Sequence, residues 1–187
     1  MSIYKEAIKE ILRFNDAFYD IDTHVPSKLL GVLGEYYVLD RLDALGYNSI
    51  VYKGGQSGYD ILVNGRRVEV RTSLLKNDGG YPDIYFYGWK VQTKKQKKGK
   101  FDILVCVALD KTFKKPKFYI FTSKEAFSVD NTENKRYPSL KKHIHLCENK
   151  KAYKAAFAAH PDFVTGFEMY INEFPQEFEN QWEKIIV

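Results

Sequence analysis

Cysteine, proline and long uncharged apolar runs are all scarce in this chain of 187 residues. Its two cysteines, Cys106 and Cys147, have neither a redox-pair spacing nor a metal-ligand spacing, which favours a reducing compartment. No stretch approaches the roughly 20 apolar residues that a membrane helix needs. Charged residues interrupt the apolar N-terminal positions, so a secretory signal peptide is not expected. We therefore expect a cytoplasmic protein without a membrane segment.

Repeats, low-complexity segments and linkers are also lacking, while 44% of the residues are hydrophobic. This composition predicts one α/β domain over residues 1–187, with a core at about 27–122. The expected helices cover 2–19, 27–45, a short segment that Ser123 caps, and a C-terminal extension of about 150–187. The expected strands cover 49–53, 59–63, 67–73, 101–109 and 117–122, with a mixed connection at 74–100. This order predicts a mixed central sheet with extra helices at both ends of the chain.

Positive charge is unevenly distributed along the chain. The formal net charge is +5, yet residues 162–187 hold six acidic residues and one lysine. Lysines gather at 90–100 and again at 111–117. Clusters of this kind favour binding to a polyanion such as nucleic acid. A run of charge can equally form a solvated surface, and the composition alone does not decide between the two.

The dipeptide Asn64-Gly65 between two β-rich runs predicts a hairpin, because both central residues of a type I′ turn need positive φ. Counting outward from the turn gives these opposed pairs: Val63 and Arg66, Leu62 and Arg67, Ile61 and Val68, and Asp60 and Glu69. Alternation then predicts an apolar core face made of Tyr59, Ile61, Val63, Val68, Val70 and Thr72. The opposite face would carry Asp60, Glu69, Arg71, Arg67 and Leu62.

Two opposed carboxylates on this second face would repel each other unless a cation lay between them. A hard divalent cation with oxygen ligands would relieve the repulsion between Asp60 and Glu69. The alternative is a solvated hairpin on which the two acids pair with Arg67 and Arg71.

The helix expected at 27–45 adds a third acid. Glu35 falls in the middle of an apolar stripe, where an unpaired carboxylate is costly. Gly31 and Gly34 flank it and allow another backbone to approach closely. Glu35 is therefore predicted either to converge on the two hairpin acids or to bond Arg71 or a backbone amide at the rim of the core.

Three segments together resemble the PD-(D/E)XK nuclease superfamily: the helical Gly34-Glu35, then Gly58-Tyr59-Asp60, and Val68-Glu69-Val70-Arg71-Thr72-Ser73. That superfamily includes type II restriction endonucleases, Holliday-junction resolvases and repair nucleases. The resemblance covers residues 27 to about 109. It implies a restriction-endonuclease-like αβββαβ core within a single nuclease domain.

The same resemblance implies a metal-dependent DNA endonuclease in which water attacks the phosphodiester bond in line and a 3′-hydroxyl group leaves. It implies that Asp60 and Glu69 ligate Mg²⁺ or Mn²⁺, with help from the Val70 carbonyl. Glu35 would contribute directly or through water. The family usually has lysine where this chain has Arg71. Arginine cannot act as a base, so Arg71 is expected to stabilise charge on the phosphate, and activation of the water falls to the metal.

Lysine and glutamine side chains around these segments are expected to contact double-stranded DNA, through its phosphates and its adenines respectively. They are Lys53, Gln56, Lys76, Lys90, Gln92, Lys94, Lys95, Lys97 and Lys98. Lys53 or Lys76 could also supply the missing amine. About half of the chain lies outside the resemblance, which favours a sequence-specific, type II restriction-like enzyme acting as a homodimer. A structure-selective, resolvase-like nuclease and an inactive DNA-binding module, the latter because of Arg71, are the alternatives.

Two further patterns have simpler interpretations. The sequence His143-x-His145-x-Cys147 would place three soft ligands on one face of a strand, but without a fourth ligand an ordinary edge strand is favoured over a zinc site. An apolar stripe in the acidic tail predicts core packing, with a dimer interface as the alternative. It consists of Phe167, Ile171, Phe174, Phe178, Trp182 and Ile185.

Overall fold

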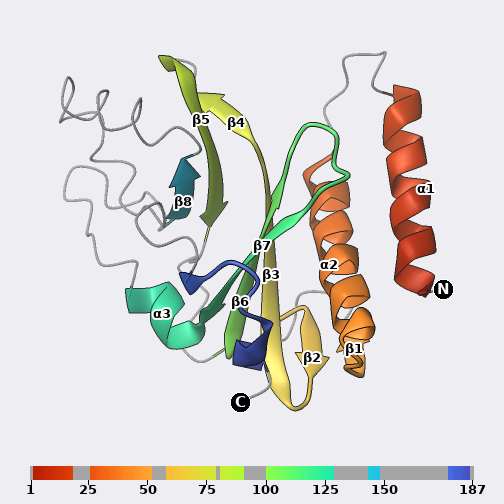
Figure 1. Cartoon of the computed structure of the whole chain (residues 1–187), viewed down its shortest axis with the longest axis vertical. Coiled ribbons are helices and arrows are strands. Elements are labelled where there is room, and N and C mark those ends of the chain that lie inside the picture. Colours follow the sequence, from red (N-terminus) through yellow and green to blue (C-terminus); the bar gives the residue numbers. More distant parts are fainter. Residues whose placement is uncertain are drawn as a thin grey trace.

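The computed structural model describes residues 2–18, 26–51, 58–78, 81–90, 100–128, 143–147 and 177–185 (Figure 1). The helices are α1 (Ile3–Phe18), α2 (Ser27–Ala44), α3 (Ser123–Ser128) and the 3-10 helix η4 (Trp182–Ile185). The strands are β1 (Ser49–Val51), β2 (Ile61–Val63), β3 (Arg66–Leu74), β4 (Lys76–Asp78), β5 (Tyr81–Lys90), β6 (Ile103–Leu109), β7 (Lys117–Thr122) and β8 (His143–Cys147). None of the described helices is both long and apolar enough to cross a membrane.

A mixed five-stranded sheet forms the centre of the fold. Its strand order is β1-β2-β3-β6-β7, in which β3 and β6 are parallel and the other neighbours are antiparallel. A second, antiparallel sheet has the order β4-β5-β8. Since β3 leads into β4 through Leu75 alone, the two sheets share one continuous run of chain. The predicted α/β class and mixed central sheet are confirmed.

Two hydrophobic clusters cover the two faces of the central sheet. On one face α2 packs over the side chains of residues such as Val70, Val105 and Ile120, and α1 packs against α2. On the other face the second sheet packs over residues such as Leu104 and Cys106. Figure 1 shows the resulting order, with the helices α1 and α2 to one side of β3 and β6 and the second sheet to the other. All seven residues of β6 are buried because both faces of this strand are covered, as its nearly continuous apolar sequence predicts.

The prediction of a mixed connection at 74–100 is wrong for the described part of this segment, because residues 76–78 and 81–90 form β4 and β5. The αβββαβ core implied a helix between the third strand and the buried central strand, but strands occupy this position in the described residues 74–78 and 81–90. Tyr87 and Trp89 explain the difference, since these alternate residues are buried against the central sheet. Aromatic alternation was the available signal, and Pro82 and Gly88 interrupt it.

The C-terminal extension was predicted to be helical, and its described part, 177–185, is not an α-helix. It forms an isolated antiparallel bridge between Tyr119 and Glu179 and then the short helix η4. Of the predicted stripe, Phe178 packs in the second cluster, whereas Trp182 and Ile185 are buried in the first. Core packing is thus confirmed for these three residues, and the other three lie outside the described residues.

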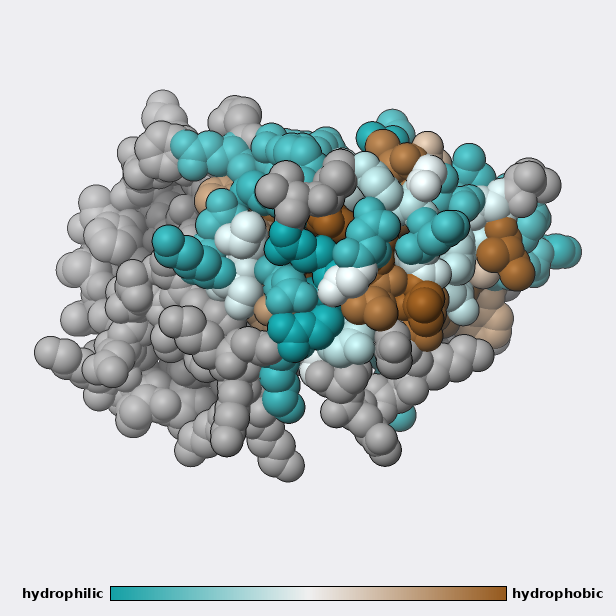
Figure 2. Space-filling view, turned by 90° about the horizontal axis from the view of Figure 1, so that it is seen from below, coloured by the Kyte–Doolittle hydropathy of each residue, from teal (hydrophilic) through white to brown (hydrophobic). Residues whose placement is uncertain are grey.

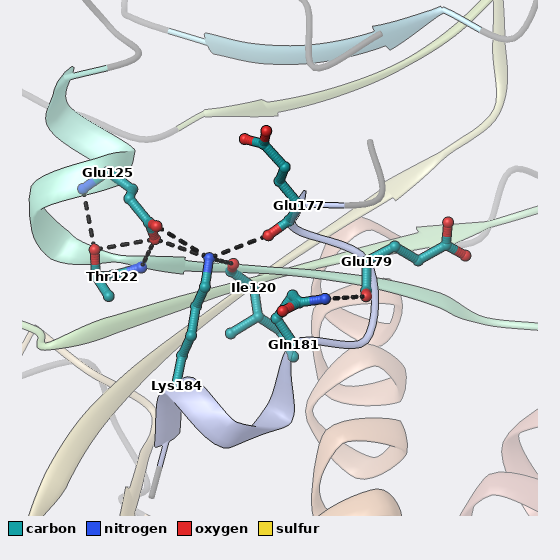
Figure 3. Close-up of polar contacts among 7 residues, drawn as sticks. All are labelled: Ile120, Thr122, Glu125, Glu177, Glu179, Gln181 and Lys184. Carbon is teal, nitrogen blue, oxygen red and sulfur yellow. Dashed lines mark hydrogen bonds and ion pairs between the residues drawn. The ribbon is translucent and has the colours of Figure 1, made fainter. Parts of the chain in front are cut away.

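Lys184 fastens this segment to β7 and α3 (Figure 3). Its ammonium group lies 3.1 Å from both carboxylate oxygens of Glu125 and 3.3 Å from the carbonyl oxygens of Ile120 and Glu177. Glu125 also belongs to a capping box, in which its carboxylate accepts the Thr122 amide at 2.7 Å and its own amide donates to the Thr122 hydroxyl at 3.1 Å. Thr122, and not Ser123, therefore caps α3.

Candidate functional site

The β2–β3 hairpin has the register that its turn predicts. Asn64 and Gly65 have φ values of 50° and 76°, as a type I′ turn requires. Val63 pairs with Arg66, and Ile61 pairs with Val68. Ile61, Val63, Val68 and Val70 are buried on the helix-covered face, which confirms the predicted core face at these positions.

Asp60 departs from the predicted register, because regular pairing of β2 ends at Ile61. The Asp60 amide donates to the Val68 carbonyl at 2.9 Å, although Ile61 is the residue paired with Val68. Two successive residues thus face Val68, as in a β-bulge. The bulge explains why Tyr59 packs against the second cluster and not on the predicted core face. Asp60 is therefore not paired with Glu69 as the count predicted.

The bulge directs the Asp60 carboxylate to the edge of β3 just beyond the end of β2. Its Oδ2 atom accepts the Val70 amide at 2.7 Å. The amide and carbonyl of one strand residue point to the same side of the strand, so the Val70 carbonyl faces this edge as well. Burial raises the pKa of Asp60, while the Val70 hydrogen bond and the charge of Arg71 oppose the rise. One carboxylate and one backbone carbonyl are thereby available at the same edge.

Glu69 and Arg71 lie on the other face of β3, as the alternation predicts. Glu69 is 4% exposed and forms an ion pair with an Arg71 guanidinium nitrogen. Their register partners on β6 are Leu104 and Cys106, which belong to the second cluster. The alternative of a solvated hairpin face does not hold for Glu69, which is buried and therefore requires its charged partner. The Nε atom of Arg71 is buried without a hydrogen-bond partner among the described residues.

Helix α2 approaches β3 at Gly34. A Cβ atom built on Gly34 would lie 1.8 Å from the Thr72 hydroxyl oxygen, so only glycine allows this contact. Glu35 follows directly and is half-buried. Its pKa is raised to about 7, first by burial and then by the negative charge of Asp60, whereas the positive charge of Arg71 lowers it. Of the two hairpin acids on which Glu35 was predicted to converge, the charge of Asp60 acts on it, and so does that of Arg71, its predicted alternative partner.

The donor chemistry of this edge suits a hard divalent cation. Burial raises the pKa of both Glu35 and Asp60, and the charge of Asp60 raises that of Glu35 further, so a bound cation would stabilise the ionised forms of these acids. The available ligands are oxygen atoms, which Mg²⁺ prefers. No three His, Cys, Asp or Glu side chains within the described ranges form a group that could hold a metal ion. A cation here would accordingly need the Val70 carbonyl and ligands from outside the protein, as Mg²⁺ sites commonly do.

Arg67, also on the outer face, is committed to another partner. Its guanidinium group forms a two-pronged ion pair with Asp102, with contacts of 2.8 and 3.1 Å. The Arg67 amide donates to the same carboxylate at 2.9 Å. Hydrogen bonding with Arg67 holds the pKa of Asp102 below its usual range despite some burial. This pair, which the sequence reasoning missed, ties β3 to the start of β6 and leaves Arg71 as the arginine nearest the acids.

Most of the predicted DNA contacts fall outside the described residues, namely Lys53, Gln56, Gln92, Lys94, Lys95, Lys97 and Lys98. Lys76 is exposed at the start of β4, and Lys90 ends β5. The side chain of Lys100, at the end of the same lysine run, packs on Gly58, two residues before Asp60. The segment His143–Cys147 forms a strand, β8, at one edge of the second sheet, as predicted. The structure does not describe the side chains of His143, His145 and Cys147.

One surface hollow lies away from this edge. An open hollow of about 600 Å³ is lined by Glu10, Ile11, Arg13, Phe14 and Leu29, between α1 and the start of α2. It contains a single acid and none of the site residues. Seen from the end of the molecule with the β2–β3 turn, hydrophilic residues occupy the middle of the surface, with hydrophobic patches beside them (Figure 2).

Comparison with known proteins gives a likeness of fold. No protein-family model and no curated protein matches this chain. Among solved structures, the chain is similar to a bacterial homing endonuclease, I-Ssp6803I, with a TM-score of 0.52 and 17% sequence identity. The match covers 86% of this chain and 92% of the other. Likeness at this identity shows that the two proteins share a mixed α/β fold.

Proposed function

We propose that this chain is a metal-dependent DNA endonuclease with a site of the PD-(D/E)XK type. The observation that carries the proposal is the convergence of Glu35, Asp60 and Arg71 at the edge of β3, with Glu69 paired to the arginine. These residues come from α2, from the bulge before β2, and from β3. The likeness of fold to a homing endonuclease supports the same assignment.

Asp60, Glu69 and the Val70 carbonyl would hold Mg²⁺ or Mn²⁺ in this proposal. Bound there, the cation would supply Lewis-acid chemistry and offset the negative charge of the phosphodiester. Asp60 is already oriented by the Val70 amide at 2.7 Å, so its free oxygen is presented at the edge without further ordering. Glu69 has to exchange its contact with Arg71 for the cation.

Arg71 would then bind a non-bridging oxygen of the phosphate. Its guanidinium group is paired with the Glu69 carboxylate, and its buried Nε atom has no hydrogen-bond partner among the described residues. A guanidinium group binds phosphate through two parallel hydrogen bonds and remains protonated. Arg71 is thereby assigned to stabilising charge and not to removing a proton.

Glu35 is the group suited to proton transfer. With a pKa of about 7, its carboxyl group exchanges protons readily near neutral pH. When ionised, it can accept a proton from the attacking water. It lies close enough to Asp60 and Arg71 for both charges to shift its pKa. The leaving 3′-oxygen would take its proton from solvent water.

We further propose that the enzyme acts on double-stranded DNA with the sequence specificity of a restriction enzyme, and that it is a homodimer. A second candidate is a DNA-binding module without activity, which the Glu69–Arg71 ion pair favours because Arg71 occupies a carboxylate that the cation would need. Sedimentation of the chain with and without a duplex tests the dimer.

Cleavage of supercoiled plasmid with Mg²⁺ or Mn²⁺ tests the function. We expect discrete linear products from the unaltered chain and a loss of about 100-fold or more in rate for Asp60→Asn and Glu69→Gln. Asp43→Asn, an exposed acid on the same helix as Glu35, is the matched control and should retain the rate. DNA binding without cleavage under either cation would establish the inactive module instead. Cleavage of branched but not linear duplexes would establish a resolvase-like enzyme.

A further inference from the structure

We infer that the ribbon formed by β4 and β5 enters the major groove of DNA and that Tyr85 contacts base edges there. This inference rests on the proposed function, because it gives that function its recognition element. The paired strands β4 and β5 form a ribbon in which Lys76 pairs with Phe86 and Asn77 with Tyr85. Two strands about 4.8 Å apart fit a major groove about 12 Å wide.

Exposure rises along one face of β5 as the strand leaves the body of the protein. Trp89 is 1% exposed, Tyr87 is 2% exposed, and Tyr85, the next residue on that face, is 39% exposed. The first two side chains pack on the central sheet, so Tyr85 lies where this packing ends. Figure 1 shows β4 and the start of β5 extending past the other strands at one end of the molecule. A large aromatic ring on a projecting ribbon is a surface suited to contact with another molecule.

The base of the ribbon is fixed to the central sheet. The Trp89 indole nitrogen donates to the Val107 carbonyl at 3.0 Å, and the Gly88 amide donates to the Ser73 hydroxyl at 3.0 Å. The rings of Tyr87 and Trp89 stack with centroids 5.9 Å apart. Since Ser73 lies on β3, the ribbon is held by the strand that carries Glu69 and Arg71. A recognition element held in this way keeps a defined position relative to the site.

The distance from the site suits reading of bases beside the cleaved bond. Arg71 and Asn77 are six residues apart along β3 and β4, which corresponds to about 20 Å of extended chain. At a rise of 3.4 Å per base pair, this spans about six base pairs. Tyr85 lies on the same face of β5 as Tyr87 and Trp89, which pack over the face of the central sheet that carries Arg71. Lys76 is exposed next to Asn77 and supplies positive charge toward the phosphates.

The test uses the full chain with the substitution Asp60→Asn, which should bind DNA without cutting it. This protein is used to select preferred duplexes from a random pool. We expect Tyr85→Ala to weaken binding to the selected duplex about tenfold, to leave binding to unrelated duplex unchanged, and to relax preference about six base pairs from the cleaved bond. Phe14→Ala, which removes another exposed aromatic ring on α1, should leave affinity and preference unchanged. Unchanged preference in a folded Tyr85→Ala chain would overturn the inference.

A second measurement covers the case in which Tyr85→Ala fails to fold. Duplexes carrying 5-bromouracil at the selected positions should crosslink, under ultraviolet light, to the peptide that contains residues 81–90 of the chain with Tyr85 intact. Crosslinks confined to other peptides would overturn the assignment of the ribbon. A chain that binds no duplex at all would instead contradict the proposed function, whereas cleavage with no role for Tyr85 would leave that function standing. If RNA competed for the binding site and DNA did not, the partner would be RNA and not DNA.

Discussion

Glu35 lies half-buried on α2, where the negative charge of Asp60 and the positive charge of Arg71 act on its carboxyl group in opposite directions. Burial and the Asp60 charge raise its pKa to about 7, whereas an unfolded chain would release the proton near 4.5. The folded protein therefore loses stability as the pH rises from about 4.5 to 7, and the loss persists above pH 7. A side chain kept at such a cost is typical of a functional site.

The first prediction concerns this cost. Glu35→Gln removes the charge, so we expect the free energy of unfolding at pH 8 to rise by about 1–2 kcal/mol, a value reduced for partial solvent exposure. At pH 4 the difference should vanish because Glu35 is then protonated. Urea titration at both pH values measures the effect, and Asp43→Asn provides a control with an exposed acid on the same helix. A less stable Glu35→Gln protein at pH 8, or unchanged cleavage by it, would contradict the assignment.

Gly34 gives the second prediction. An alanine at this position would place its methyl group 1.8 Å from the Thr72 hydroxyl oxygen, so α2 has to move away from β3. We expect Gly34→Ala to lower the free energy of unfolding by about 1–3 kcal/mol and to displace Glu35 from the site. Thermal unfolding and cleavage rate measure the two effects.

Gly31 offers a matched control for Gly34. Nothing lies within 4 Å of a Cβ atom built there, so Gly31→Ala should stabilise the helix by up to about 1 kcal/mol. Adding Thr72→Ala to Gly34→Ala removes the closest oxygen and should restore part of the stability. Equal effects of the two glycine substitutions would show that helix propensity, and not contact with β3, governs Gly34.

At the same scale, the sequence predicted the hairpin turn and its register better than the surroundings of the candidate site residues. The Asn64-Gly65 turn fixed the register as far as Ile61 and Val68, because a two-residue turn leaves one pairing. The bulge at Asp60 could not be predicted, because it depends on the tertiary hydrogen bond between the Asp60 carboxylate and the Val70 amide. The burial of Glu69 likewise required knowledge of the second sheet that covers it.

At the scale of elements, the C-terminal segment is joined to β7 and α3 through one lysine. Lys184 contacts Glu125 and two backbone carbonyl groups, and its ammonium group lies 4.9 Å from the centre of the Phe178 ring. Although burial alone would raise the pKa of Glu125, hydrogen bonds from Thr122 and Lys184 lower it. The ion pair therefore stabilises the fold above the ordinary pKa of glutamate and loses its effect as the pH falls.

The third prediction follows from this contact. Lys184→Met should lower the free energy of unfolding by about 1–3 kcal/mol at pH 7, which corresponds to about 2–12 °C in Tm. The loss should shrink at acid pH, where Glu125 becomes protonated. Lys114→Met is the control, because Lys114 pairs with Asp16 at 3.6 Å on an exposed surface and should contribute little. Differential scanning calorimetry compares the two, and equal losses would contradict a special role for Lys184.

Elements whose apolar residues follow one clear period were predictable from the sequence, whereas elements that depend on tertiary contacts were not. The two N-terminal helices and the buried strand β6 appear where the apolar pattern placed them. The strand β5 was missed because Pro82 and Gly88 interrupt its aromatic alternation, and its partner β8 lies more than 50 residues away in the chain. The helix η4 replaces an expected α-helix because Trp182 and Ile185 pack in one cluster while Phe178 packs in the other.

At the scale of the whole molecule, the central sheet lies between α1 and α2 on one face and the second sheet on the other. The chain crosses from one layer to the next at Leu75, so the strand of the proposed site and the ribbon of the proposed recognition element are one continuous piece. This arrangement places the Asp60 carboxylate at the edge of β3 where β2 ends. The proposed chemistry and the proposed recognition would thereby be held by one continuous run of chain, which limits how far one can move relative to the other.

The distribution of lysines across the molecule gives the last prediction. Neutralising phosphates releases counterions, so the logarithm of DNA affinity falls linearly with the logarithm of salt concentration, by about 0.9 per phosphate contacted. If the lysines at 90–100 contact the backbone, replacing Lys94, Lys95, Lys97 and Lys98 by Gln should reduce this slope by about three to four. The same change at Lys111, Lys114, Lys115 and Lys117 removes equal charge and should alter the slope little. Fluorescence anisotropy at 50 to 200 mM salt measures both, and equal reductions would mean that net charge, and not the position of the first lysine run, governs binding.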